Sequence, residues 1–287
     1  MKDHQHVFAV GKMCRVFKVS RSGYYHWLNR KPSQREVENS ELKTNIVEVH
    51  RLSRFRLGSP KIQKELEDRG FYISRPRVAR LMKQLEIRSI IHRKFKVVTT
   101  DSNHGYTLSP NLLNRDFTAS SPGQKWVSDI TYVKTNQGWL YLTIVLDLFD
   151  RKIIGWSMSR NMESGNTVIA AFKMAIRNRP VNPEELIFHS DRGVQYACGE
   201  FRNLLHSYRI LQSMSRKGNC WDNAVAECFF KILKSELIYQ IPNLPYGQAR
   251  IEIFEFIEIW YNKKRKHSYL NYLTPEQFEK SNQSKAA

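Results

Sequence analysis

The chain has 287 residues and carries 46 lysine and arginine side chains against 27 aspartate and glutamate side chains, a formal net charge of +19. Hydrophobic residues make up 41% of the chain and charged residues 25%, which excludes a wholly disordered protein. The length allows one large domain or two modest ones. The positive charge attracts polyanions and favours nucleic acid, bound through its phosphates, as the partner.

No segment of the sequence is typical of a membrane protein. The most apolar stretch, Trp139–Phe149, contains Asp147 and is much shorter than the about 20 residues that a membrane span needs. The first residues lack the apolar region of a secretory signal. The four cysteines are too few and too far apart for a disulfide framework or a zinc site. We therefore expect a cytoplasmic protein with reduced cysteines.

Residues 1–96 are predicted to form a helical, basic, DNA-binding region of the helix-turn-helix type. Val7–Phe17 and Arg21–Asn29 are expected to form two short helices around a tight turn, with Ser20 as an N-cap. The same pattern fits a helical hairpin without a function about equally well.

Two stronger helical patterns follow in this region. Ser59 is predicted to be an N-cap before a proline at the first helical position, and Gly70 to end that helix. Ser74 can cap the next helix. Apolar residues at Val78, Leu81, Met82 and Leu85 follow the i, i+3, i+4, i+7 rule and predict a buried stripe.

The opposite face of this last helix carries a row of cations. Arg75, Arg77 and Arg80 are followed by Lys83, and the basic run Arg88–Lys96 comes next. A helix with an apolar back and a cationic front suits insertion into a DNA groove, so we predict that the three arginines contact DNA. A solvated charged face is the alternative.

Residues 97–123 are rich in residues that form turns and linkers, so the domain boundary is placed there. From Trp126 the pattern changes to that of β-strands. Trp126–Val133, Trp139–Leu146 and Ile153–Met158 are separated by short turns and predict an antiparallel meander.

The remaining pattern predicts alternating helices and short strands. Val168–Ile176 and a segment around Phe201 are expected to be helical, Leu186–Ser190 and Ile210–Gln212 to be strands, and Ala224–Ile238 to be a helix capped by Asp222. The order βββαβαβα indicates an α/β fold, an RNase H-like mixed sheet. We assign residues 124–287 to this catalytic core and a C-terminal helical tail.

Three carboxylates fall where such a core converges. Asp129 lies inside a strand among residues that favour burial, Asp191 directly follows an apolar strand, and Glu227 lies on the first turn of the last core helix. Clustered carboxylates without nearby histidine or cysteine ligands favour Mg²⁺ or Mn²⁺ over zinc, and two such ions can assist a phosphoryl displacement. Asp147, at the end of the neighbouring strand, is a competing ligand or a structural hydrogen-bonding group.

The segments around these acids resemble the catalytic signatures of a known family. Trp126–Tyr132, His189–Tyr196 and Ser213–Phe230 are similar to the motifs of insertion-sequence family three transposases, specifically the OrfB product with a retroviral-integrase-like DDE core. The likeness continues into Tyr261–His267 and back through Arg56–Leu85, so it covers nearly the whole chain.

The resemblance implies a DDE triad of Asp129, Asp191 and Glu227, with Mg²⁺ or Mn²⁺ as cofactor. It places the basic residue seven positions after the glutamate at Lys234, which shares a helix face with Glu227 and can reach a DNA phosphate. Val194 and Cys228 depart from the family pattern, where serine is frequent, but neither position is expected to coordinate a hard cation.

The loop before the last core helix is predicted to contact the DNA end. Arg216, Lys217 and Asn219 carry this prediction, although Gly218 also fits an ordinary flexible loop. Trp221 is expected to be buried in the core, with a wedge that stacks on a base as the alternative.

The resemblance implies a DNA transposase that cleaves at insertion-sequence ends with water and joins the freed 3′-hydroxyl to another DNA phosphate. It also implies a homo-oligomer on DNA and, in many members, fusion to an upstream OrfA product by ribosomal frameshifting. Two alternatives remain open: an RNase H-like nuclease without joining activity, and a non-catalytic DNA-binding repressor of transposition.

Overall fold

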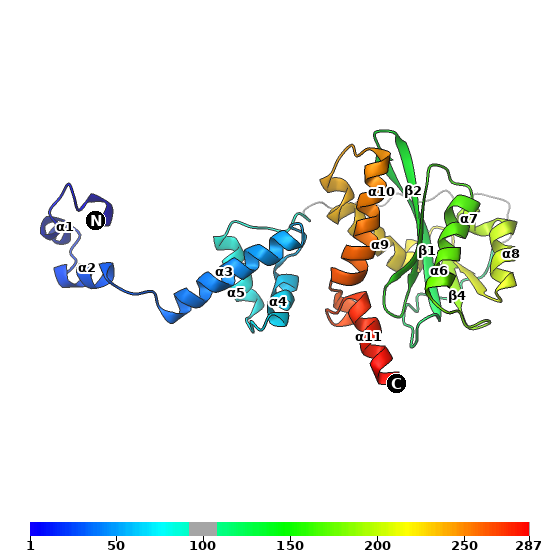
Figure 1. Cartoon of the computed structure of the whole chain (residues 1–287), viewed down its shortest axis with the longest axis horizontal. Helices are drawn as coiled ribbons and strands as arrows, with labels where there is room; N and C mark the ends of the chain where they lie inside the picture. Colours follow the sequence, from blue (N-terminus) through cyan, green and yellow to red (C-terminus); the bar gives the residue numbers. More distant parts are fainter. Residues whose placement is uncertain (92–107, 287) are drawn as a thin grey trace. The chain divides into compact units, whose positions relative to one another are not determined.

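The computed structural model describes residues 1–91 and 108–286, which belong to two compact units (Figure 1). The first unit spans Met1–Arg88 and the second Ser89–Ala287. The predicted linker, residues 97–123, and the basic run Arg88–Lys96 lie partly outside the described residues. In the part of the chain that the structure describes, no helix combines the length and the apolar character of a membrane span.

Two short helices open the first unit after a single turn, η1 (Lys2–His4). They are α1 (Val10–Val16) and α2 (Arg21–Leu28), on either side of a tight turn. The Ser20 hydroxyl accepts a hydrogen bond of 3.0 Å from the backbone N–H of Gly23. Both helices and the Ser20 cap confirm the sequence prediction.

A 19-residue helix, α3 (Gln34–Leu52), occupies a stretch for which the sequence pattern made no prediction. It begins with a capping box: the Ser33 hydroxyl accepts from the N–H of Glu36, and the Glu36 carboxylate accepts from the N–H of Ser33. Its polar residues outnumber its apolar ones, but Leu42 and Ile46 are buried and give it an inner face.

Helices α4 (Ser59–Asp68) and α5 (Arg75–Gln84) pack with α3. The prediction that Ser59 caps α4 is wrong by one residue, because the Gly58 carbonyl already accepts the first helical hydrogen bonds. Gly70 follows α4 with φ of +88°, as predicted for the residue that ends this helix. The buried apolar side chains of the three helices are Leu42, Ile46, Val49, Ile62, Leu66, Val78, Leu81 and Met82.

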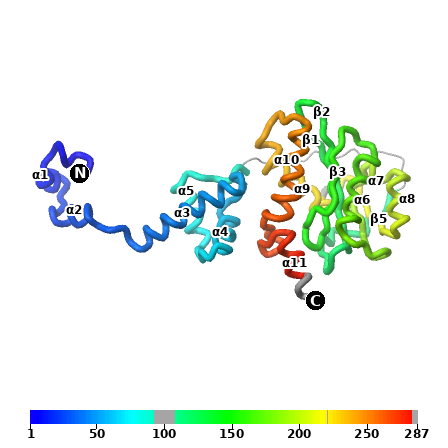
Figure 2. Tube along the Cα trace, viewed as in Figure 1, coloured from blue at the N-terminus to red at the C-terminus, as the bar shows by residue number. Residues whose placement is uncertain are grey.

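A five-stranded mixed sheet forms the centre of the second unit, in the order β3-β2-β1-β4-β5 (Figure 2). The strands are β1 (Lys125–Thr135), β2 (Gly138–Asp147), β3 (Ile153–Ser159), β4 (Ile187–Ser190) and β5 (Leu211–Met214). β1, β2 and β3 form an antiparallel meander, whereas β4 pairs in parallel with both β1 and β5. The predicted RNase H-like α/β sheet is confirmed.

Helices cover both faces of this sheet, with α6, α7 and α8 on one side and α9 and α10 on the other (Figure 1). The helical segments are η2 (Gly165–Ile169), α6 (Ala170–Asn178), α7 (Val194–Ala197), α8 (Gly199–Ser207), η3 (Cys220–Asn223), α9 (Ala224–Glu236), η4 (Ile238–Gln240), α10 (Tyr246–Glu255), η5 (Phe256–Lys264), η6 (Ser268–Leu270) and α11 (Pro275–Ala286). The predicted helix at Val168–Ile176 spans the end of η2, which has π-helical bonding, and most of α6.

The core between the sheet and α6 is aromatic. Trp126, Phe172, Phe188 and Phe201 are fully buried, and the Phe172 ring meets each of the other three edge-on, with centroids 5.7–6.5 Å apart. At Gly155 of β3 a Cβ would collide with the backbone of α6, so glycine is required for this close approach.

The described part of the predicted linker, residues 108–123, is attached to the second unit. The Ser213 hydroxyl accepts from the backbone N–H groups of Leu112 and Leu113 at 2.9 and 3.3 Å, and Leu113 is buried. This segment therefore adds contacts to the β5 end of the sheet.

Candidate active site

Asp129 lies on β1 just beyond the point where β1 stops pairing with β4. The last matched residues of these two parallel strands are Val127 and His189. The Asp129 carboxylate accepts a hydrogen bond of 2.8 Å from the N–H of Ile130. Continuing the register by two residues on each strand brings Asp129 opposite Asp191, so the two acids share one edge of the sheet.

Asp191 directly follows β4, and the chain turns sharply after it. Its Oδ1 accepts a hydrogen bond of 2.9 Å from the N–H of Gly193. A Cβ at Gly193 would lie 3.0 Å from the same oxygen, so glycine leaves room for this turn. The bond holds the Asp191 carboxylate near the strand end.

Glu227 lies on the first turn of α9, and Asn223 ties this end of the helix to β1. The Asn223 side-chain amide donates a hydrogen bond of 3.1 Å to the backbone oxygen of Ser128, the residue before Asp129. The strand with the first acid and the helix with the third are thus joined directly. Asn223 was not identified from the sequence, although an asparagine just before a helix is a typical cap signal.

The three carboxylates influence one another electrostatically. Burial raises the pKa of Asp129 well above its ordinary value, and the charges of Asp191 and Glu227 raise it further, against the hydrogen bond from Ile130. Burial also raises the pKa of Glu227, and Asp191 adds to that effect. The structure therefore brings the three sequence-predicted acids into one electrostatic cluster.

Lys234 lies two helical turns after Glu227 and belongs to the same cluster. Burial lowers its pKa, whereas the charge of Asp129 raises it. Its Nζ lies 5.7 Å from the centroid of the Tyr132 ring, within the range of a cation–π contact. This position beside the acids suits contact with a phosphate that approaches them.

The donor set of the cluster is chemically suited to a hard divalent cation, because all three groups offer carboxylate oxygens and repel one another. Within residues 1–91 and 108–286, however, no three His, Cys, Asp or Glu side chains stand close enough together to hold a metal ion as they are placed. A shared ion would therefore require the carboxylates to come closer together.

Asp147, the competing candidate, is fully buried and engaged elsewhere. Its carboxylate accepts hydrogen bonds from the Gly123 N–H at 2.9 Å and the Trp126 indole N–H at 3.2 Å, and pairs with the Arg179 guanidinium at 2.9 Å. Arg179 also pairs with Asp150 at 2.8 Å. Asp147 is therefore a structural hydrogen-bonding group.

The prediction that Asp222 caps α9 is wrong, because its carboxylate binds two arginines instead. Asp222 is fully buried within η3, and Arg216 donates to it from the side-chain Nε at 2.9 Å and Nη2 at 2.8 Å. Arg115 adds a bond of 2.9 Å from Nε. The hydrogen bond from Arg216 holds the pKa of Asp222 below its ordinary range.

The three loop residues predicted to bind DNA differ in their contacts. Arg216 is committed to Asp222, and the Asn219 side-chain oxygen accepts a bond of 2.9 Å from Arg115. Lys217 is exposed. Trp221, predicted to be buried, is 68% exposed, because η3 is held through Asp222 and turns the indole outward.

The three arginines of α5 that were predicted to contact DNA also differ in exposure and in contacts. Arg75 and Arg80 are exposed, whereas the Arg77 guanidinium donates to Glu38 at 3.0 Å and to Asn39 at 3.0 Å on α3. Arg77 joins two helices of the first unit in addition to carrying charge.

A buried histidine beside Asp191 was missed by the sequence reading. The two ring nitrogens of His189 contact the hydroxyls of Ser213 at 2.8 Å and Ser215 at 3.2 Å. Burial lowers its pKa to about 4, so the ring is neutral at pH 7. It links β4 to β5 two residues before Asp191.

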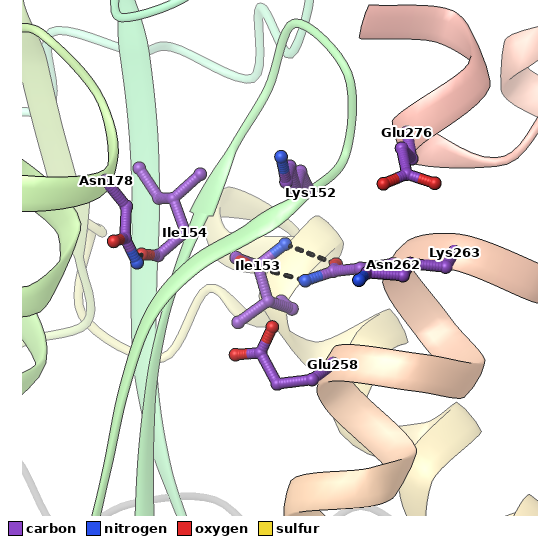
Figure 3. Close-up of a pocket in the computed structure, with 8 residues that line it drawn as sticks. All are labelled: Lys152, Ile153, Ile154, Asn178, Glu258, Asn262, Lys263 and Glu276. Atoms are coloured by element: carbon purple, nitrogen blue, oxygen red, sulfur yellow. Dashed lines mark hydrogen bonds between the residues drawn. The ribbon is translucent and has the colours of Figure 1, made fainter.

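A polar cavity of about 350 Å³ lies along β3, at the C-terminal helices (Figure 3). Asn262 exchanges two hydrogen bonds with the backbone of Ile153 at its wall. None of the sequence-predicted site residues lines it; its lining residues are Lys152, Ile153, Ile154, Asn178, Glu258, Asn262, Lys263 and Glu276.

Comparisons with known families match both units. A family described as an integrase core domain matches residues 119–220, and a second of the same description matches residues 208–275. A family described as an HTH-like domain matches residues 36–95, which include α4, α5 and all but the first two residues of α3. The hairpin of α1 and α2 lies outside that match.

Curated relatives align over nearly the whole chain. The chain is 42% identical to the insertion element IS600 uncharacterized 31 kDa protein of Shigella sonnei over 276 residues, 96% of this chain and 100% of the relative. It is 39% identical to the transposase InsF for insertion sequence IS3A of Escherichia coli strain K12 over 284 residues, 98% of each chain.

Among solved structures, the chain is similar to the integrase catalytic core domain of HTLV-2 in complex with magnesium. The TM-score is 0.42 at 23% sequence identity, covering 55% of this chain and 97% of that one.

Proposed function

We propose, since this chain belongs to the IS3 family of insertion-sequence transposases and is a DNA transposase, that it is a DDE polynucleotidyl transferase whose metal ligands are Asp129, Asp191 and Glu227. The reaction would consist of two in-line phosphoryl transfers: hydrolysis of a DNA strand at the element end, then attack of the freed 3′-hydroxyl on a second DNA phosphate. Three acids from β1, the end of β4 and α9, mutually coupled, are the observation that carries this proposal.

Burial is the main cause of the raised pKa values of Asp129 and Glu227, and repulsion from the neighbouring carboxylates adds to it. Asp129, Asp191 and Glu227 would hold Mg²⁺ or Mn²⁺, whose charge would offset the repulsion among the carboxylates, and the proposal includes two such ions. When bound, such ions stabilise the attacking and leaving oxygens as Lewis acids.

Residues of the chain position the three acids and would hold the reacting phosphate. Backbone hydrogen bonds fix Asp129 within β1 and Asp191 just after the adjacent strand β4, and Asn223 ties the start of the helix that carries Glu227 to β1. Lys234 supplies a positive charge next to them, where it can hold the phosphate beside the cleaved bond.

DNA contacts beyond the acids would come from exposed cations. On α5, Arg75 and Arg80 have their charges available to phosphates, whereas Arg77 is shared with α3. In the loop before α9, Lys217 and the indole of Trp221 are exposed and suit the DNA end. Arg216 and Asn219 would act mainly by fixing the loop that presents them.

We further propose that the protein acts in the cytoplasm as a homo-oligomer that pairs two element ends. Fusion to an upstream OrfA product is part of the same proposal and is carried by family resemblance alone. Sedimentation of the chain with and without DNA of the element end tests the oligomer.

A strand-transfer assay with Asp191→Asn tests the assignment of the site. The variant should retain DNA binding and lose both cleavage and joining in Mg²⁺, while Glu200→Gln, an acid bonded to Ser164, serves as the matched control and should retain both. Full joining by Asp191→Asn would refute the metal site.

The same assay separates the alternatives. Cleavage without joined product by the wild-type chain would indicate an RNase H-like nuclease, and binding without either product would indicate a repressor.

A further inference from the structure

Two aromatic rings lie half-exposed on the hairpin that carries Asp129. Tyr132 on β1 and Trp139 on β2 are each 46% exposed, and their ring centroids are 5.3 Å apart with planes at 87°. In the strand register Trp139 faces Lys134, two residues from Tyr132, so these three side chains lie on one face of the hairpin.

This pair is connected to the acid cluster through one lysine. Tyr132 is three residues from Asp129 on the same strand, and the Nζ of Lys234 lies 5.7 Å from the Tyr132 centroid. Lys234 also interacts electrostatically with Asp129. Tyr132 and Asp129 point to opposite faces of β1 by strand alternation, and Lys234 is the side chain that links the ring pair to the first acid.

The chemistry of this ring pair is that of a site for single-stranded nucleic acid. Both rings are partly exposed to solvent, and nucleobases stack on exposed aromatic rings whatever their sequence. Cations next to the rings, Lys134 and Lys234, can neutralise the phosphates that flank a stacked base.

We propose that Tyr132 and Trp139 form a stacking subsite for an unpaired base of the DNA strand whose phosphate lies at the carboxylates. The inference rests on the proposed function, because it places this strand at Asp129. The subsite would hold the terminal nucleotides apart from their complement, so that the scissile phosphate is presented to the acids.

The test measures binding of the full chain to two DNA ends, one fully paired and one with unpaired terminal nucleotides, in EDTA so that no strand is cut. Trp139→Ala and Tyr132→Ala should weaken binding to the unpaired end about tenfold, the size typical of one lost stacking contact. Binding to the paired end should change much less. Tyr132→Phe and Trp139→Phe keep an aromatic ring and should retain most of the affinity.

A matched control is Tyr208→Ala. Tyr208 is 41% exposed, at the end of α8, and its ring packs edge-on against Phe172 at 5.7 Å, so its removal has a similar local effect away from the hairpin. It should bind both DNA ends as the wild type does. A thermal melt of each variant verifies that the chain is folded.

A second readout identifies the stacked residues directly. DNA with 5-iodouracil in the unpaired end, irradiated at long wavelength, should form a crosslink that mass spectrometry maps to Trp139 or Tyr132. The proposal is overturned if crosslinks map elsewhere, if the alanine variants weaken both ends equally, or if they change self-association and leave DNA binding intact, as a protein interface would.

These outcomes are independent of the catalytic assignment. Binding and crosslinking are measured without metal. They can therefore support the stacking subsite even if Asp191→Asn still joins DNA, which would refute the metal site. They can also refute the subsite when Asp191→Asn is inactive, as the metal site predicts.

Discussion

The Arg265 guanidinium and the Glu236 carboxylate form a buried ion pair with an Nη2–Oε1 distance of 2.9 Å. Glu236 is the last residue of α9, the helix that begins beside Glu227, and it also accepts a hydrogen bond of 2.9 Å from the Trp260 indole. Arg265 follows η5. The C-terminal segment therefore holds the C-terminal end of α9, the helix that supplies the third acid.

Arg265→Ala should destabilise the second unit strongly. The change leaves Glu236 buried without its cation, and breaking such a pair typically costs about 3–5 kcal/mol. Urea denaturation of the variant measures the change in the free energy of unfolding. Arg209→Ala is the matched control, because its pair with Glu184 is exposed and 3.5 Å long, and exposed pairs contribute about 0–1 kcal/mol. Equal losses of unfolding free energy in the two variants would contradict a stabilising role of the Arg265–Glu236 pair.

His189 should make stability depend on pH. Its folded pKa, about 4, is below the ordinary value of 6.5, so the unfolded chain binds the extra proton between these values. Stability from this group is therefore complete above pH 6.5 and falls as the pH drops towards 4, by about 3 kcal/mol in all.

The check compares the wild type with His189→Asn by thermal melts from pH 8 to pH 4. The variant is expected to lose stability less steeply over the window from 6.5 to 4. Parallel curves for both proteins would show that the histidine does not titrate as inferred.

Asp129→Asn should raise stability in metal-free buffer and abolish catalysis. An amide avoids the cost of burying a carboxylate and relieves the repulsion from Asp191 and Glu227, while its oxygen can still accept from Ile130. A gain of about 1 kcal/mol corresponds to a rise of about 2–4 °C in Tm.

Adding MgCl₂ should reverse this order. A ligand that binds only the folded protein raises Tm, so the wild type should be stabilised by Mg²⁺ and Asp129→Asn much less. Melts in EDTA and in MgCl₂ measure both effects, and an equal Mg²⁺ response in the two proteins argues against Asp129 as a ligand.

Arg80→Ala and Arg77→Ala should separate DNA contact from helix packing. Arg80 is exposed, so its loss should weaken DNA binding at low salt and reduce the salt dependence of log K by about one unit per lost phosphate contact. Arg77→Ala should lower the stability of the first unit by about 1 kcal/mol through its bonds to Glu38 and Asn39. Salt titrations and melts of both variants provide the comparison.

Local sequence patterns predicted the structure correctly where short-range interactions determine it. The apolar and β-branched runs of β1 and β2, the helical period of α5 and the cap at Ser20 all agree with the sequence prediction. A helix such as α3, which is mostly polar, shows no such period, and its inner face became evident only from what it packs against.

The sequence by itself determined the strands of the sheet, the order of strands and helices along the chain, the family and the identity of the candidate acids. The residue pattern of a strand and the residues of a motif are properties of contiguous segments. The tertiary structure alone decided that Asp222 anchors a loop through Arg115, 107 residues away, and that Trp221 is exposed. It also decided that Asp147 pairs with Arg179. Such partners meet only after the chain has closed long loops, and no local pattern encodes which distant group will neutralise a buried charge.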